Sequence, residues 1–311
     1  MARFGLAAPE RPAYHARPAP QHSGPALRIL PIVSALAAAL TLAACASGPT
    51  PAGRMSDLEL TWHQAQSAVP DMIGGGVTTI SDPSRQELLA STGRKFPVVV
   101  YMHGCTGISD SDRALMRTIA KAGYVVVAPN SMARKYRPLQ CASWNKQGGF
   151  NLFVFDFRQE EINFALQQIA GNPWADWDNL FIVGVSEGGL AAAHFRGGLF
   201  KARVITQWTC HGSTWVRGID GPEDTPVLAV VRKDDPWYTS GSGKQAGDCS
   251  AFFGDKRPGS ESIVLDEGKG HDVIDDPGVA SRIVDFLGRY RTVKPQPPVQ
   301  RGNNDDVLPL R

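Results

Sequence analysis

The sequence has almost no excess of charge of either sign and no apolar run long enough to span a bilayer. Its 311 residues carry 32 Lys and Arg against 30 Asp and Glu, a formal net charge of +2. A nearly neutral chain gives no electrostatic reason to expect binding to nucleic acid. No segment repeats at a fixed period, which argues against a solenoid or a propeller. The hydrophobic fraction of 42% is ordinary for a globular protein, so wholesale disorder is excluded too.

The longest apolar run lies near the N-terminus and predicts an export signal. It follows Arg28, covers residues 29–42 and leads into the sequence Leu-Ala-Ala-Cys, which ends at Cys45. At about 14 residues it is shorter than the ~20 that a spanning helix needs, and it fits the apolar core of a signal peptide. A plain signal peptide and a short membrane anchor are the alternatives to the interpretation that follows.

The Leu-Ala-Ala-Cys ending resembles the lipobox of bacterial lipoproteins. That resemblance implies cleavage before Cys45 and acylation of this cysteine, so residues 1–44 would be a lipoprotein signal peptide with a long N-terminal region. Ala46, in place of Asp, implies sorting to the outer membrane. We therefore expect a membrane-anchored, periplasm-facing lipoprotein of the bacterial envelope.

The composition of the rest of the chain predicts one domain between two irregular ends. Residues 45–70 are rich in small residues and are interpreted as a tether, and residues 292–311 are rich in Pro, Asn and charge and are interpreted as a disordered tail. The intervening residues 71–291 are long enough for a single α/β domain with one large core.

Within this domain, Val- and Ile-rich runs alternate with segments of helical spacing. Because parallel strands covered on both faces show such runs, the pattern predicts a mainly parallel, doubly wound α/β sheet. Ligands of such sheets bind at the carboxyl ends of the strands. Ser111 is a plausible cap of the first helix. Strands are expected at 96–102, 124–128, 180–185, 204–208, 227–231 and 262–265, and helices at 110–122, 155–169, 187–197 and 279–290.

A G-x-S-x-G pentapeptide, residues 184–188, lies between an expected strand and an expected helix. This layout is that of a nucleophile elbow, a sharp turn that exposes the serine hydroxyl and whose glycines relieve crowding. Ser186 is therefore the candidate nucleophile. A glycine-rich turn without catalytic function is the alternative.

A second glycine-rich loop, His-Gly-Cys-Thr-Gly at residues 103–107, follows the strand at 96–102. Acyl-transfer enzymes place an oxyanion-hole donor on such a loop. We expect the backbone N–H of Glu187 and that of Cys105 or Thr106 to bind the oxyanion. His103 is expected to shape the loop by hydrogen bonding, and it is not assigned as the catalytic base.

The expected acid and base follow two later strands. Asp234 and Asp235 come after the strand at 227–231, and either could orient a histidine. His271 lies between glycines in the loop after the strand at 262–265 and is the candidate base. His211 is the rival, but it precedes the acid in the chain.

The chain order Ser186, Asp235, His271 is that of the α/β-hydrolases. With the segment at residues 129–134 and Cys141 downstream, the sequence resembles secreted α/β-hydrolases of the dienelactone-hydrolase-like group over most of residues 75–291. The resemblance implies the α/β-hydrolase fold and Asp235 as the acid, with Asp234 as the second choice. Dienelactone hydrolases themselves use a cysteine nucleophile, so the lactone substrate is not carried over to a chain with serine.

Cysteine is scarce, with five in the chain, and four remain if Cys45 is acylated. An even number in an oxidising compartment predicts two disulfides, for which three pairings exist. We favour Cys105–Cys141 and Cys210–Cys249, because each pair then joins loops that follow neighbouring strands. Inert buried thiols are the alternative.

The sequence thus predicts a serine hydrolase that cleaves a small-molecule or polymeric carboxylic ester through an acyl-enzyme, as a monomer, without cofactor or metal. A non-catalytic envelope-binding lipoprotein and an acyltransferase or peptidase with the same triad are the alternatives. Aromatic residues on strand-end loops could line a cleft, and a basic group could bind an acidic substrate; packing and a solvated loop are the plainer interpretations. The residues in question are Trp144, Trp208, Trp215, Trp237 and Tyr238, and Arg134, Lys135 and Arg137.

Overall fold

The six parallel strands expected from the sequence are consecutive strands of an eight-stranded sheet in the computed structural model, which describes residues 55–142, 147–148, 153–211, 216–238 and 247–293. The expected signal peptide 1–44, Cys45 and nearly all of the expected tail lie outside the described residues. So do Trp144 and Trp215. In the described ranges, no helix is both long and apolar enough to cross a membrane.

The strand order is β10-β9-β8-β7-β3-β4-β1-β2. All neighbouring strands from β10 to β4 run parallel, while β1 is antiparallel to both β4 and β2. This sheet confirms the predicted fold class, a mainly parallel α/β domain. The strands are β1 (Gln66–Ala68), β2 (Val77–Thr79), β3 (Phe96–Met102), β4 (Val125–Ala128), β7 (Ala175–Val185), β8 (Ala202–Thr206), β9 (Val227–Arg232) and β10 (Glu261–Leu265); the short pair β5 (Cys141–Ala142) and β6 (Gln147–Gly148) lies apart from the sheet.

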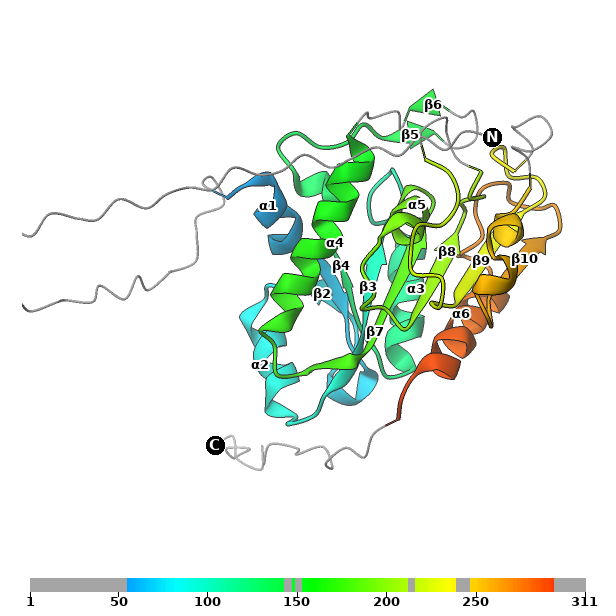
Figure 1. The fold of residues 1–311 in the computed structure, drawn as a ribbon. Coiled ribbons are helices and arrows are strands. Elements are labelled where there is room, and N and C mark those ends of the chain that lie inside the picture. The colour runs from blue at the N-terminus through cyan, green and yellow to red at the C-terminus, as the bar shows by residue number, and fades with distance from the viewer. Residues whose placement is uncertain (1–54, 143–146, 149–152, 212–215, 239–246, 294–311) are drawn as a thin grey trace, which may run out of the picture. The chain divides into compact units, whose positions relative to one another are not determined.

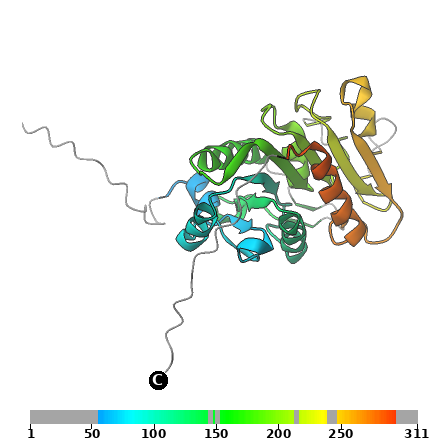
Figure 2. The same cartoon turned by 90° about the horizontal axis from the view of Figure 1, so that it is seen from below.

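Helices cover both faces of the sheet (Figure 1), and Figure 2 shows the same layers from below. Alternate residues of β3 enter the two cores: Val99 and Tyr101 pack with α3 and α6, and Val98 and Val100 pack with α2, α4 and α5. Burial on both faces explains why the central strands are continuous apolar runs. The helices are α1 (Asp57–His63), α2 (Pro83–Ser91), α3 (Asp110–Lys121), α4 (Val154–Ala170), α5 (Glu187–His194) and α6 (Pro277–Tyr290).

The described part of the expected tether is folded, so the domain begins before residue 71. A capping box between Ser56 and Glu59 starts α1. Strand β1 pairs with β4, where Gln66 faces Ala128. A seven-residue helix and a three-residue strand carry little periodicity of their own, and β1 is stable only because it extends an existing sheet.

Several element boundaries also differ from the prediction by a few residues, and two of the differences lie near the expected site. Ser109, and not Ser111, caps α3, because its hydroxyl accepts from the N–H of Asp112 while the Asp112 carboxylate accepts from the N–H of Ser109. Strand β8 ends at Thr206 rather than at residue 208. Its successor, Gln207, has φ of 59°, which leaves the extended region.

Candidate active site

The turn between β7 and α5 exposes Ser186 at the carboxyl edge of the sheet. Ser186 has φ of 56° and ψ of −116°, and α5 begins at the next residue. Glycine is required on both sides. A Cβ on Gly184 would lie 2.1 Å from the carbonyl oxygen of Gly188, and one on Gly188 would lie 1.9 Å from that of Met102. The pentapeptide therefore forms a strained elbow that only this spacing of glycines permits.

Ser186, His271 and Asp235 form one continuous chain of hydrogen bonds. The Nε2 of His271 lies 2.8 Å from the Oγ of Ser186, and its Nδ1 lies 2.8 Å from the Oδ2 of Asp235. Asp235 follows β9 and His271 follows β10, so three separate strand ends bring the three side chains together. Asp235 is fully buried and His271 is nearly so.

The two adjacent aspartates have different positions. Asp235 contacts the imidazole, and its Oδ1 accepts a hydrogen bond from the N–H of Trp237 at 2.8 Å. The Oδ2 of Asp234 accepts from the N–H groups of Gly268 and Gly270, at 2.8 and 3.0 Å. These backbone hydrogen bonds, above all that from Gly268, hold the pKa of Asp234 below its usual value. Asp234 thus holds the loop that carries the histidine.

The rival histidine lies away from the serine hydroxyl. The Nε2 of His211 is 3.0 Å from the carbonyl oxygen of Asp248, and its ring packs edge-on against Phe252 at 5.1 Å. The structure therefore brings His271, and not His211, into contact with Ser186.

The loop after β3 lies beside the nucleophile. A Cβ on Gly104 would be 3.5 Å from the Cβ of Ser186, and Cys105 and Thr106 line the same cavity as Ser186. Across from them, Glu187 is the first residue of α5, where a backbone N–H has no partner within the helix. The residues expected to form an oxyanion hole are thus next to the serine, while their donor role remains a prediction.

His103 holds this loop in place through two hydrogen bonds. Its Nε2 accepts from the N–H of Ser131 at 3.1 Å, so its Nδ1 carries the proton and donates to the carbonyl of Gly104 at 2.6 Å. Burial, with the Arg158 guanidinium nearby, lowers the pKa of His103 to about 3. A neutral imidazole that joins two backbone segments matches the structural part expected for it.

Both favoured disulfides are present. Cys105 is bonded to Cys141 and Cys210 to Cys249, with Cα atoms 5.7 and 5.0 Å apart. The first joins the loop after β3 to β5, and both of its cysteines line the cavity beside Ser186. It therefore restrains the segment that carries the expected Cys105 and Thr106 donors.

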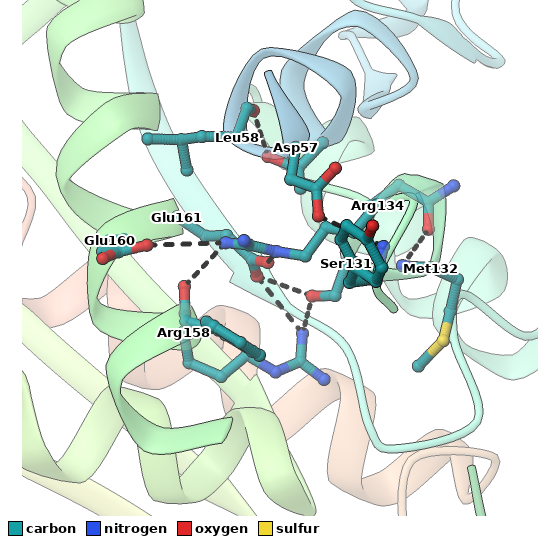
Figure 3. A network of polar contacts seen from close by, with 12 residues as sticks. Asp57, Leu58, Ser131, Met132, Arg134, Arg158, Glu160 and Glu161 are labelled. Atoms are coloured by element: carbon teal, nitrogen blue, oxygen red, sulfur yellow. Dashed lines mark hydrogen bonds and ion pairs between the residues drawn. The ribbon is translucent and has the colours of Figure 1, made fainter. Parts of the chain in front are cut away.

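A buried ion network, which the sequence reasoning missed, contacts the residues on both sides of Ser186. Figure 3 shows the part of it that joins Arg158, Ser131, Arg134 and Glu161. Arg158 of α4 is fully buried. Its guanidinium donates twice to the Oε1 of Glu187, through Nη2 at 2.7 Å and Nε at 3.1 Å, and once to the carbonyl of Gly104 at 3.3 Å. It also donates to the hydroxyl of Ser131. One feature of the sequence could have indicated this network: Arg158 is a charged residue on the otherwise apolar face of α4.

For Arg134, the same network overturns both interpretations, whereas Lys135 and Arg137 are exposed, as a solvated loop predicts. Its side chain is buried, donates from Nε to Glu161 at 2.8 Å and lies over the ring of Phe157 at 4.7 Å. Arg134 is therefore neither a solvated loop residue nor an open site for an acidic substrate. Lys135 donates to the carbonyl of Met55 at 3.0 Å, and Arg137 is exposed.

Ser186 opens into a cavity of about 250 Å³. None of the aromatic residues in the predicted cleft is among the described residues that line it; Trp208 instead packs against the ring of His194 at 5.2 Å. No group of three or more His, Cys, Asp or Glu in the described ranges is placed to hold a metal ion.

The chain resembles known hydrolases in part of its sequence. Solved structures similar to it include a Klebsiella pneumoniae protein proposed to be a dienelactone hydrolase (18% identity, TM-score 0.45, 63% of this chain and 88% of that one). A second is Est1E of Butyrivibrio proteoclasticus with ferulic acid bound, with 12% identity, a TM-score of 0.46 and coverage of 73% of this chain and 94% of that one. A third is a hyperthermophilic esterase of Pyrobaculum calidifontis, with 16% identity, a TM-score of 0.41 and coverage of 63% of this chain and 78% of that one. No curated protein matches the chain. Residues 86–236 match the model of the Dienelactone hydrolase family, and this match supports a hydrolase.

Proposed function

We propose that this protein is a serine hydrolase that cleaves carboxylic esters. The observation that carries the proposal is the unbroken contact from carboxylate to imidazole to hydroxyl, with 2.8 Å at each step among Asp235, His271 and Ser186. Such geometry lets a weak nucleophile lose its proton as it attacks.

The chemistry follows from the contacts of the imidazole. The Nε2 of His271 takes the proton of Ser186 while Oγ bonds to the ester carbonyl carbon, and it then passes this proton to the departing alkoxide, which leaves as an alcohol. Water attacks the acyl-enzyme by the same route, so ester and water become acid and alcohol. Asp235 orients the ring and stabilises its cationic form throughout.

The oxyanion that forms in each step would lie between Glu187 and the loop at Cys105 and Thr106. Two backbone N–H groups fixed at that position strengthen their hydrogen bonds as charge develops on the oxygen. One such donor is worth ~3–4 kcal/mol of activation free energy. The substrate is expected to be small, because the cavity volume is below the common range for ligand pockets.

Turnover of chromogenic short-chain esters tests this proposal. We expect hydrolysis by the wild type and a loss of at least about 10³-fold in kcat for Ser186→Ala, which keeps the fold. A purely binding protein would give no turnover above background. An acyltransferase would convert the ester mainly when an acceptor alcohol is added, and a peptidase would cleave the matching amide at a comparable rate.

We also propose that the mature protein is tethered to the bacterial envelope through lipid on Cys45. Support comes from the apolar run at 29–42 and the Leu-Ala-Ala-Cys ending. Cells fed radioactive palmitate should label the wild type and not Cys45→Ser, and the label should fractionate with the outer membrane. Equal labelling of both forms would contradict the proposal.

A further inference from the structure

Gln207 is placed beside the candidate nucleophile by the sheet itself. It follows β8, the strand next to β7, and the N–H of Ser186 donates to the carbonyl of the preceding residue, Thr206, at 2.8 Å. The N–H of Gln207 donates to the carbonyl of Val230 in β9 at 2.9 Å. Gln207 therefore lies between the strand that carries Ser186 and the strand that leads to Asp235, and it lines the cavity with Ser186.

The backbone of Gln207 has a strained conformation. In the described ranges, three residues other than glycine have positive φ: Ser186, Gln207 and Cys210. Ser186 forms the elbow and Cys210 forms a disulfide. Gln207 does neither, although its φ of 59° costs free energy in an L residue. Such strain gathers at ligand sites, where the surrounding structure maintains it.

The side chain of Gln207 is unfavourable as well. It is 5% exposed, and its Oε1 is buried without a hydrogen-bond partner. A few other described side chains also have an unpartnered buried polar atom, but none of those residues lines the cavity. An unpaired amide oxygen is a costly group to keep unless a ligand supplies the missing donor.

The described wall of the cavity offers hydrogen-bond acceptors and negative charge. Ser109 and Ser111 line it, as do three aspartates. Asp272 is exposed, the side chain of Asp275 is partly exposed and accepts from Lys269 at 2.5 Å, and Asp112 is hydrogen-bonded to Ser109. No lysine or arginine is among the described lining residues. A ligand group that donates a hydrogen bond and carries no negative charge fits this part of the wall.

We propose that Gln207 determines specificity by accepting a hydrogen bond from a hydroxyl group near the scissile ester, so that the preferred substrates are small hydroxylated esters. The proposal rests on the ester hydrolysis proposed above. The cavity of about 250 Å³ has room for a group at least as large as a benzene ring.

Two pairs of esters of nearly equal size test it: phenyl hydroxyacetate with phenyl propionate, and 2-hydroxyethyl butyrate with propyl butyrate. The measured quantity is the ratio of kcat/KM within each pair, divided by the ratio of hydroxide-catalysed rates to remove intrinsic reactivity. For the wild type, we expect this corrected ratio to favour the hydroxylated ester about fivefold or more in at least one pair. The pair that responds shows whether the hydroxyl lies on the acyl or the alcohol side.

Variants of Gln207 test whether its side-chain amide causes the preference for the hydroxylated ester. Gln207→Leu has no acceptor and should bring the corrected ratio to within twofold of one, whereas Gln207→Glu keeps an acceptor oxygen and should retain the preference. Gln167→Leu changes an exposed glutamine on α4 and should match the wild type.

The outcomes separate the two proposals. A corrected ratio near one for the wild type in both pairs would overturn the role of Gln207, and this result needs no variant to fold. A preference that Gln207→Leu retains would overturn it too. Failure of the wild type to hydrolyse any of the four esters would contradict ester hydrolysis itself.

Discussion

Arg158 donates two hydrogen bonds to the carboxylate of Glu187, the residue that follows Ser186, and a third to the carbonyl of Gly104 in the opposite loop. One buried guanidinium thus joins the two segments from which the expected oxyanion donors project. This contact helps to fix the separation between those donors, because among the side-chain contacts of the described residues it is the one that links Glu187 to the loop after β3.

Shortening this link should slow the chemistry more than it weakens binding. Arg158→Lys keeps the charge but loses the forked geometry, and we expect kcat to fall roughly 10- to 100-fold with little change in KM. Kinetics on a short-chain ester measure both parameters. Glu187→Gln, which retains one acceptor oxygen, is the milder control and should lie in between. An unchanged kcat in a folded Arg158→Lys would contradict the positioning role.

The two disulfides should contribute similarly to stability and differently to activity. They close segments of similar length, with sequence separations of 36 and 39, so chain entropy predicts a loss of about 3–4 kcal/mol for removing either. Only the first borders Ser186. We expect the double variant at Cys105 and Cys141, both changed to Ala, to lose several-fold in kcat.

The matched double variant at Cys210 and Cys249 is the control for this comparison. It should unfold at a similar denaturant concentration and retain most of its kcat. If the two variants lose activity equally while both are folded, the restraint of the loop after β3 has no special part in catalysis.

Acid should destabilise the fold through His103. Its pKa is lowered from 6.5 to about 3, so between these values the unfolded chain binds a proton that the folded protein excludes. The stabilisation is complete above pH 6.5 and decreases as the pH falls toward 3. At pH 4.5, two units below the unfolded value, this one group removes roughly 2–3 kcal/mol.

Urea unfolding at pH 7.5 and at pH 4.5 measures that loss. His103→Gln keeps polar atoms for the two backbone segments but does not titrate, so its difference between the two pH values should be smaller than that of the wild type by about this amount. An identical pH dependence would mean that the pKa of His103 is the same in the folded and the unfolded chain.

Substitutions of Asp234 and Asp235 should lower kcat to different extents. Asp235→Asn removes the carboxylate that orients His271 and should lower kcat by up to about 10⁴-fold. Asp234→Asn retains an amide oxygen for Gly268 and Gly270, so a loss of less than about tenfold is expected. Ester kinetics of the two variants give the comparison, and equal losses would contradict the assignment.

Much of the fold could be predicted because its central strands are buried on both faces. The run at Phe96–Met102 matches β3 without adjustment. The candidate nucleophile could be predicted as well, because close contacts with the backbone require glycine at positions 184 and 188 and so leave a recognisable pattern in the sequence. Elements that depend on their neighbours were not predicted: β1 has three residues and is supported by its pairing with β4 and β2 and by the burial of Ala68 in the core.

The features missed around the site are those set by tertiary contacts. Arg134 precedes a lysine in a polar segment, and only the position of Glu161 on α4 shows that it is buried in an ion pair. Nothing in the sequence indicates that the side-chain oxygen of Gln207 lacks a hydrogen-bond partner, because this depends on which donor groups the fold brings near it. The choice between Asp234 and Asp235 likewise required the position of the imidazole.

Labelling with a fluorophosphonate probe tests the central claim most directly, because the probe reacts only with an activated hydroxyl. The account predicts stoichiometric modification of the peptide that contains Ser186, strong slowing in His271→Ala, and no labelling in Ser186→Ala. Absence of labelling in the folded wild type, or labelling that persists in Ser186→Ala, would contradict it.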